Sequence, residues 1–425
     1  MIGDSDNCSM SRANKSSSDK NTNWKGDFEE ALRYTRWLLR ILGIWHLVAT
    51  KSMKIEKYLS RVIVPLVLLA MISLTLPIYS HVITRPIDHL ELIVLLGPIV
   101  AQTANIFMYL TTIMRSDTIR ACIRHIEIDW KRIENSTERR IMRRHARFSH
   151  TLTIACIIFM YTAALCYSLI MPLMAGNTIN EFNETLRPLP VPGTDIFIDA
   201  QANVIYEIVF AMNFISALFH DTVITAVCHL AIILVSHACG QIQVIIWNLE
   251  NNFQHSASAA EKKPLRRFMT ERIRFIVLRH VRLLKFVENI EKALKEIFLI
   301  EVVSSTLIMC FIEYDIIIAL EHTSVDRLEM ISYVMLLASF TFNLFLYCQF
   351  GEVLNSQCQR VGTIAYMIDW YKLPNRIQLD FIMIMNTARY PCKLTAGGIM
   401  ELSIANFASI SKTSVAFLNM MRTMG

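Results

Sequence analysis

The sequence predicts an all-α membrane protein with seven transmembrane helices, its N-terminus cytoplasmic and its C-terminus extracellular. Three observations predict this fold class: seven separated apolar stretches, a low content of charged residues, and an uneven distribution of Lys and Arg. A helix needs about 20 mostly apolar residues to cross the roughly 30 Å hydrocarbon core of a bilayer, where lipid offers an unpaired backbone no hydrogen-bond partner. The predicted helical spans are 59–80, 88–114, 149–171, 202–236, 296–318, 329–350 and 395–421.

The composition agrees with a membrane protein. Hydrophobic residues make up 53% of the chain and charged residues 18%, whereas an ordinary soluble domain carries about 25% charged residues. The mean hydropathy is +0.38. The sequence has no HExxH, GxSxG or P-loop motif, and its ten cysteines form no CxxC or Cys/His metal spacing. We therefore expect neither enzyme activity nor a metal or cofactor.

Lys and Arg lie almost entirely on one side of the predicted spans. The N-terminal segment to Lys57 holds ten, 115–148 ten, 237–295 eleven and 352–394 five, whereas 81–88, 172–201 and 319–328 hold one each. The positive-inside rule then places the N-terminus and the basic loops in the cytoplasm. Because this topology accounts for the net charge of +6, we expect membrane lipid as a partner and no nucleic acid.

The segment that precedes the first span divides into two parts. Residues 1–26 are polar, which predicts a disordered cytoplasmic N-terminus. Residues 27–58 carry apolar side chains at helical spacing, which predicts an amphipathic helix. This helix could lie on the inner membrane surface or pack against the helix bundle. Its apolar face comprises Phe28, Ala31, Leu32, Thr35, Leu38, Leu39 and Leu42.

Within the seven-helix domain of residues 59–425, two basic segments also have helical periodicity. The pattern of 237–295 predicts that spans four and five continue into the cytoplasm as long helices. Together with 352–394 they would form a cytoplasmic helical anchor layer, which would suit subunit contact. Gly397-Gly398 permits a break between a helix at 375–393 and the final span.

Few ionisable residues fall within the predicted spans. His220-Asp221 in the fourth span is a candidate functional pair, although helix pairing is the favoured interpretation. Glu401 and Lys412 interrupt the final span. A lysine that faces a narrow pore would repel cations, so Lys412 should point away from any cation pore. One face of the same span carries Thr413, Ala416, Met420 and Met424. This face is small and polar at its inner end and apolar near its outer end. An apolar ring can close a pore by dewetting, although a plain packing stripe is the favoured interpretation.

Aromatic and small polar residues cluster in the outer halves of several spans, and they include Tyr161, Tyr206, Phe210, Asn213 and Tyr333. An apolar pocket with a few polar groups between helices is the usual form of a small-molecule site. Aromatic residues near the interface are equally expected as a belt. In the longest outer loop, Asn183-Glu-Thr is the one credible N-glycosylation acceptor, unless it is an unused chance match.

The last seventy-five residues carry an ordered set of motifs. They are Phe350-Gly351-Glu352, Asn355-Ser356, Ala365-Tyr366, Trp370-Tyr371, Leu373-Pro374, Pro391, Leu394-Thr395-Ala396-Gly397, Leu402-Ser403, Phe407, Ser409-Ile410, Lys412-Thr413-Ser414, Phe417 and Met420-Met421-Arg422. This set resembles the C-terminal signature of insect odorant receptors. Leu42-Gly43-Ile44-Trp45 is similar to the N-terminal pattern of the same family. The chain departs from the family pattern at Gly398, at Ala405-Asn406 and at Val415-Ala416.

The resemblance implies a ligand-gated, non-selective cation channel in the plasma membrane of olfactory sensory neurons. Such receptors assemble as heterotetramers with a shared co-receptor subunit, and this chain would be the odorant-tuning subunit. The final helix of each subunit lines the pore, so the resemblance makes Met420 and Met424 gate candidates. The odorant sits among the outer halves of the second, third, fourth and sixth spans. The corresponding pocket candidates are Tyr161, Leu165, Tyr206, Phe210, Asn213 and Tyr333.

Three other classes of protein remain as alternatives. A gustatory-type ligand-gated channel has a related architecture, but Gln349-Phe350 lies in the sixth span and not in the final one. A G-protein-coupled chemoreceptor would need an external N-terminus, and the chain lacks its Asp-Arg-Tyr and Asn-Pro-x-x-Tyr motifs. A transporter would be favoured by repeat symmetry or paired broken helices, which the sequence does not contain.

Overall fold

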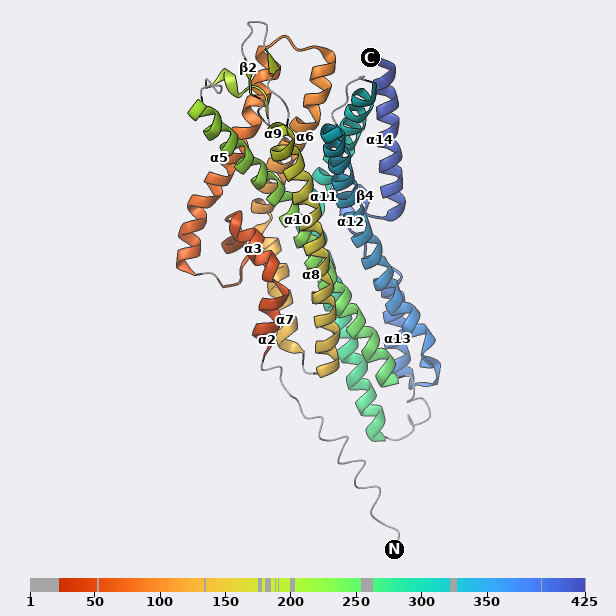
Figure 1. Cartoon of the computed structure of the whole chain (residues 1–425). Helices are drawn as coiled ribbons and strands as arrows, with labels where there is room; N and C mark the ends of the chain where they lie inside the picture. The colour runs from red at the N-terminus through yellow and green to blue at the C-terminus, as the bar shows by residue number, and fades with distance from the viewer. Residues whose placement is uncertain are drawn as a thin grey trace.

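The computed structural model describes residues 23–51, 53–133, 135–174, 178–179, 185–187, 189, 191–198, 203–253, 263–321, 327–390 and 392–424. Asn183 and most of the predicted disordered segment 1–26 lie outside these residues. The described chain is almost entirely helical (Figure 1).

In the part of the chain that the structure describes, six helices are long and apolar enough to cross a membrane. They are α5 (Lys54–Thr84), α6 (His89–Met114), α8 (Ser136–Leu165) with its continuation through η1 (Cys166–Ile170) and α9 (Met171–Met174), α10 (Asn203–Phe253), α11 (Lys263–Glu321) and α12 (Arg327–Met367). They correspond to the first six predicted spans. The seventh, α14 (Ile404–Met424), is more polar and is not among the six.

The seventh helix begins nine residues later than the predicted start at 395. The strands β3 (Thr395–Ala396) and β4 (Met400–Glu401) pair antiparallel, with Thr395 opposite Glu401. Gly397 and Gly398 form the turn at φ values of 65° and 77°, a conformation that glycine adopts without strain. Glu401 therefore lies outside the helix, where it forms an ion pair with Lys393. The interpretation that Glu401 interrupts the final span is wrong.

Three short helices replace the single amphipathic helix predicted over 27–58. They are α2 (Trp24–Ala31), α3 (Arg33–Ile41) and α4 (Trp45–Val48). Gly43, at a φ of 73°, turns the chain between α3 and α4. Leu38 and Leu39 are buried in the main core. This segment therefore packs against the bundle, which is the second of the two placements that the sequence left open.

The end of the molecule opposite the C-terminus is a second layer of helices, here called the basal layer (Figure 1). It consists of α7 (Ser116–Arg132), α13 (Asn375–Ala388), the turn η4 (Trp370–Lys372) and the ends of α8, α10, α11 and α12 nearest to them. Helix α10 is the centre of both layers and contacts α5, α6, α8, α11 and α12. At the other end lie β1 (Thr178–Ile179), β2 (Thr185–Leu186) and η2 (Thr194–Ile196).

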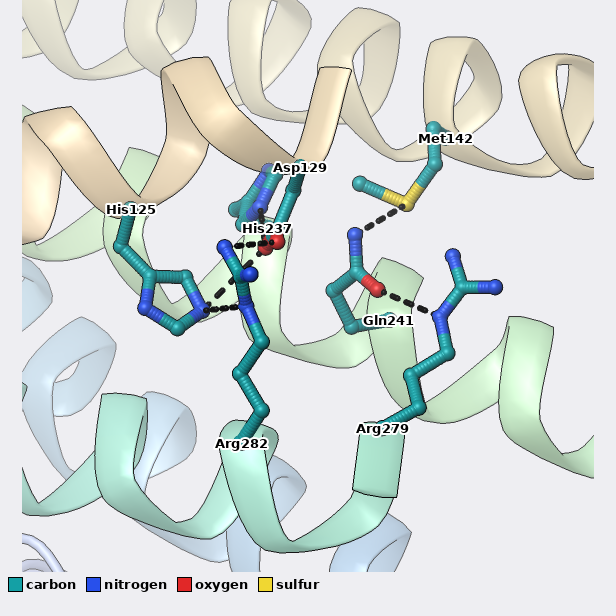
Figure 2. Close-up of polar contacts among 7 residues, drawn as sticks. All are labelled: His125, Asp129, Met142, His237, Gln241, Arg279 and Arg282. Atoms are coloured by element: carbon teal, nitrogen blue, oxygen red, sulfur yellow. Dashed lines mark hydrogen bonds and ion pairs between the residues drawn. The ribbon is translucent and has the colours of Figure 1, made fainter. Parts of the chain in front are cut away.

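A buried ionic network joins four helices of the basal layer (Figure 2). The Asp129 carboxylate of α7 accepts a hydrogen bond from His237 of α10 at 3.1 Å and pairs with Arg282 of α11 at 2.7 Å. His125 lies 3.3 Å from the same carboxylate. Burial opposes the charge of Asp129, but the hydrogen bonds from His125 and His237 hold the pKa of this carboxyl well below its usual range.

A second buried carboxylate extends this network to α8. Glu138 pairs with Arg279 of α11 at 3.0 Å and accepts a hydrogen bond from Asn248 of α10 at 2.8 Å. Arg279 also donates to Gln241 at 3.1 Å (Figure 2). The basal layer is thus held by directional contacts as well as by apolar packing, so the four helices that these contacts join, α7, α8, α10 and α11, have a defined register relative to one another.

Candidate functional site

A cavity of about 140 Å³ lies among α5, α6, α10, α11, α12 and η1. An engineered apolar cavity of about 150 Å³ accommodates benzene, so this volume suits a small organic molecule. Small side chains at Gly97, Ala101, Ala164 and Ala217 leave the space between the helices. Most of the lining is apolar, and its strongly polar side chains are Gln102, Asn105, Ser168, Asn213, His220, Asp221 and Asp315.

The π-helical turn η1 shapes one wall of the cavity. Within Cys166–Ile170 the backbone is wound more loosely than in the α-helix on either side. Such turns are often found at functional sites because they redirect side chains. Here both Tyr167 and Ser168 of η1 line the cavity, and the Ser168 hydroxyl donates back to the Ala164 carbonyl at 2.5 Å.

Several polar atoms at the cavity are buried without a hydrogen-bond partner among the described residues. They are Oε1 of Gln102, Nδ2 of Asn213 and Nδ1 of His220, and the three side chains are 8%, 5% and 4% exposed. A buried polar group left unpaired destabilises a protein by about 1–3 kcal/mol. A guest bound in the cavity would be offered three hydrogen-bonding groups.

Two of the six predicted pocket residues, Asn213 and Tyr333, line this cavity. Tyr161 lies nearby but is engaged between α8 and α10. The Thr222 hydroxyl donates to the Leu218 carbonyl at 2.6 Å, so the Tyr161 hydroxyl donates to Thr222 at 2.7 Å. Tyr161 therefore links the two helices behind the cavity wall.

The other three predicted pocket residues lie away from the cavity lining. Leu165 is 36% exposed on the outer surface of α8. Tyr206 and Phe210 contact each other on α10 with ring centroids 6.0 Å apart, and the Arg187 guanidinium lies 5.4 Å from the Tyr206 ring. The structure brings neither ring into the cavity.

Part of the polar lining is predicted from the sequence and the rest is not. The sequence makes His220-Asp221 a candidate functional pair and favours helix pairing, and the Nε2 of His220 does contact the Met71 carbonyl of α5 at 3.3 Å. Yet His220 and Asp221 both line the cavity, as do Gln102 and Asn105 of α6. A signal was present, because Gln102 and Asn105 are amide residues at i, i+3 in a largely apolar helix.

The predicted pore face of α14 is uncovered in the single chain. Thr413, Ala416 and Met420 are exposed, and so is Lys412. The opposite face packs on α11 and α12, where buried Ser414 donates to the Glu313 carboxylate at 3.0 Å. Met424 ends the helix.

Comparison with known proteins gives the following similarities. A sequence family described as 7tm Odorant receptor matches residues 88–415. Odorant receptor 13a of Drosophila melanogaster is 23% identical over 305 residues, which are 68% of this chain and 69% of that protein. Odorant receptor 83a of the same organism is 22% identical over 184 residues, 40% of each chain.

Among solved structures, the fold is similar to the insect olfactory receptor OR5 from Machilis hrabei. The TM-score is 0.72 at 13% sequence identity, over 95% of this chain and all of that one. The structure of the same receptor in complex with eugenol gives a TM-score of 0.73 at 14% identity, again over 95% of this chain and all of that one.

Proposed function

Because this chain belongs to the 7tm Odorant receptor family, we propose that it is an odorant-tuning subunit of a ligand-gated, non-selective cation channel. The family assignment favours this function over a gustatory-type receptor. The observation that carries the proposal is that one stretch of α11 both lines the cavity and contacts α14. Ile312 and Asp315 line the cavity, and Glu313 between them accepts the hydrogen bond from Ser414 of α14.

This arrangement gives a physical path from ligand to pore. A ligand shifts a conformational equilibrium only if it binds one state better than the other. A small volatile molecule that fills the cavity would favour the position of α11 in which the cavity is widest. Because α11 holds α14 through Glu313 and Ser414, a movement of α11 is transmitted to the helix whose exposed face carries Thr413, Ala416 and Met420.

The proposed ligand is a small volatile molecule. The cavity volume of about 140 Å³ and its mostly apolar lining support it. The similar receptor OR5 has been solved in complex with eugenol, which is a compound of this kind. Burial of the apolar surface would supply most of the affinity, and the buried polar groups would select among ligands of similar shape.

The proposed partner is the co-receptor subunit, in a heterotetramer. Two features support an assembly. The polar helix α14 has an uncovered face, and a pore through a membrane needs such faces from several subunits. The basal layer also exposes large apolar side chains beside a groove between α12 and α13, including Tyr366 at 67%, Leu379 at 66% and Met383 at 57% exposure. Exposed apolar patches of this kind mark contact surfaces.

We propose that the basal layer is cytoplasmic and that α14 ends outside the plasma membrane of an olfactory neuron. The support is the distribution of Lys and Arg, because segments 115–148 and 237–295 alone hold twenty-one of them. Epitope tags at the two termini, read on intact cells, test this orientation. A G-protein-coupled receptor would place the N-terminal tag outside.

The function is tested by co-expression with the co-receptor and a panel of volatiles, with inward current as the measurement. We expect at least one volatile to open a current in excised patches without GTP, since a channel needs no G protein. Ala217→Trp should abolish that response because the ring fills the cavity. Ala211→Trp, on the exposed face of the same helix, should leave it intact. Electrical silence under every stimulus, with both subunits at the surface, would refute the proposal.

A further inference from the structure

We propose that the cavity selects amines: its ligand is a compact molecule whose protonated nitrogen pairs with Asp221. This inference rests on the proposed function, because it takes the cavity to be the ligand site. It goes further by assigning the chemical class of the ligand. The argument depends on which hydrogen-bonding groups the lining presents, on their charge, and on the space available.

Two unpartnered atoms at the cavity are hydrogen-bond acceptors. His220 Nε2 faces the Met71 carbonyl at 3.3 Å, and a carbonyl only accepts, so the ring proton sits on Nε2. The other ring nitrogen, Nδ1, is therefore an acceptor with a free lone pair. Gln102 contributes an unpartnered carbonyl oxygen, Oε1. Asn213 contributes an amide nitrogen, Nδ2, that has no partner among the described residues and is a donor for an acceptor elsewhere on the guest.

The charged groups of the lining are all of one sign. Two carboxyl groups, those of Asp221 and Asp315, line the cavity, and no Lys or Arg of the described residues does so. An isolated carboxylate is unfavourable in an apolar environment unless a cation or hydrogen-bond donors compensate it. Asp221 follows His220 directly on α10, so its carboxyl and the acceptor Nδ1 belong to the same turn of the wall.

Three aromatic residues line the cavity together with these carboxyl groups and acceptors. Tyr167, Tyr333 and Phe340 come from two elements, η1 and α12, and all three line the cavity. The face of an aromatic ring attracts a cation within about 6 Å of its centre. Carboxylates, neutral acceptors and aromatic rings together form an environment that stabilises an ammonium group and gives no counter-ion to an anionic ligand.

An amine satisfies this lining better than other polar ligands of the same shape. An ammonium group offers up to three N–H donors and a positive charge, whereas an alcohol offers one O–H donor and no charge. The ion pair between the ligand nitrogen and Asp221 can form in two ways. A protonated amine can bind the ionised carboxylate, or a neutral amine can take the proton of the carboxylic acid. In both routes the product is the same ammonium–carboxylate pair. Charge-assisted hydrogen bonds are roughly twice as strong as neutral ones.

The volume limits the size of the amine. At about 140 Å³ the cavity accommodates roughly one six-membered ring. Cyclohexylamine, cyclohexanol and methylcyclohexane are therefore suitable probes. They share the ring and the number of heavy atoms, and differ only in whether the substituent is a cation, a neutral donor or a methyl group.

The experiment compares these three probes on the full-length receptor co-expressed with the co-receptor. We expect cyclohexylamine to act at a half-maximal concentration roughly tenfold or more below that of cyclohexanol, with methylcyclohexane weakest. Asp221→Asn should remove this advantage, so that the half-maximal concentrations of cyclohexylamine and cyclohexanol differ by less than about twofold. Glu207→Gln makes the same chemical change on α10 at an exposed position outside the cavity and should change neither value.

A second readout separates this inference from the proposed function. The complex in lipid nanodiscs should melt at a higher temperature with cyclohexylamine than with cyclohexanol, and Asp221→Asn should abolish that difference. If volatiles open the channel but cyclohexylamine has no advantage in either readout, the inference is overturned and the function stands. If no volatile evokes current, the function fails, and the melting shift alone upholds or overturns the inference. Should Asp221→Asn not reach the surface, the wild-type probe series decides.

Discussion

At the scale of single residues, Asp129 has the most consequential set of partners in the basal layer. Its buried carboxylate is met by His125 from its own helix, by His237 from α10 and by Arg282 from α11. Neutralising such a group leaves the opposite charge buried without compensation, which is more damaging than the loss of the attraction itself. This carboxylate therefore contributes strongly to the packing of α11 against α7.

Asp129→Asn should lower the free energy of unfolding by about 3 kcal/mol, the lower end of the range for breaking a buried pair. The lower end applies because 24% of the Arg282 side chain is exposed. Thermal unfolding of the purified protein measures the loss. Asp117→Asn on the same helix is the matched control. Its pair with Arg120 is 88% exposed on the Asp117 side, so its loss should lie below about 0.5 kcal/mol. Equal effects of the two changes would contradict the account.

The pH dependence of the stability that Asp129 contributes follows from the direction in which its pKa is shifted. The pKa of Asp129 is lowered in the folded protein, so its contribution is fully present above the ordinary aspartate value of 3.8 and is lost only as pH falls through the folded value. The stability deficit of Asp129→Asn should therefore not shrink between pH 8 and pH 5. A deficit that disappears by pH 5 would mean that Asp129 is not ionised in the folded state.

The pocket residues predicted from sequence match the cavity lining only in part. Asn213 and Tyr333 were placed in a pocket from depth and residue type, and both line the cavity. Leu165, Tyr206 and Phe210 were chosen on the same grounds and lie elsewhere. Membrane depth does not determine the direction in which a side chain points around the helix axis, so residues at the same depth can face the cavity or away from it. The π-turn η1 changes that direction again for Tyr167 and Ser168.

At the scale of elements, the segment between α13 and α14 connects the basal layer to the proposed pore helix. Thr395 of the hairpin donates its backbone N–H to Glu291 of α11 at 2.9 Å, and the Gly397 N–H donates to the Lys295 carbonyl at 2.8 Å. Gly351 of α12 lies directly against Leu402. The start of α14 is thus fixed to both α11 and α12, so a movement of either helix reaches it.

Gly351→Ala tests the tightness of this junction. An added Cβ would overlap the Leu402 carbonyl oxygen and lie 2.7 Å from the Leu402 Cβ, so the backbone that leads into α14 must shift. We expect a loss of about 2 kcal/mol in thermal unfolding. Gly26→Ala, where nothing lies within 4 Å of the added atom, should cause no loss. A Gly351→Ala protein as stable as the wild type would show that the junction is loose.

Elements themselves were predicted well where the apolar pattern is long. Each of the seven expected spans has a matching helix, and six of these helices are long and apolar enough to cross a membrane, because a run of some 20 apolar residues has few alternatives to a helix. The start of α14 was missed by nine residues. The hairpin before it is specified by two glycines and by contacts to Glu291 and Lys295, which lie about a hundred positions earlier in the chain and leave no local signal.

At the scale of the whole molecule, two surfaces of the single chain would be completed only in an assembly of subunits. One is the groove between α12 and α13, with Tyr366, Leu379 and Met383 exposed beside it. The other is the uncovered face of α14. They lie in different layers of the molecule, so an assembly could be held in the basal layer while its pore opens and closes elsewhere.

Leu379→Asp should reduce co-purification with the co-receptor by roughly tenfold, because a charge would be buried at the proposed contact. Leu278→Asp introduces the same charge at another exposed apolar position of the basal layer, 60% exposed on α11, and should leave co-purification near the wild-type amount. If both variants co-purify as well as the wild type, the groove is not the subunit contact.

The most direct test of the channel account is cysteine accessibility on α14 during an odorant-evoked current. Thr413→Cys places a thiol on the exposed face, and Ser414→Cys places one on the buried face against Glu313. A charged, membrane-impermeant thiol reagent applied with the odorant should block the current through the Thr413→Cys receptor irreversibly and leave the Ser414→Cys and wild-type receptors unaffected. An undiminished Thr413→Cys current under the same treatment would contradict a pore lined by α14.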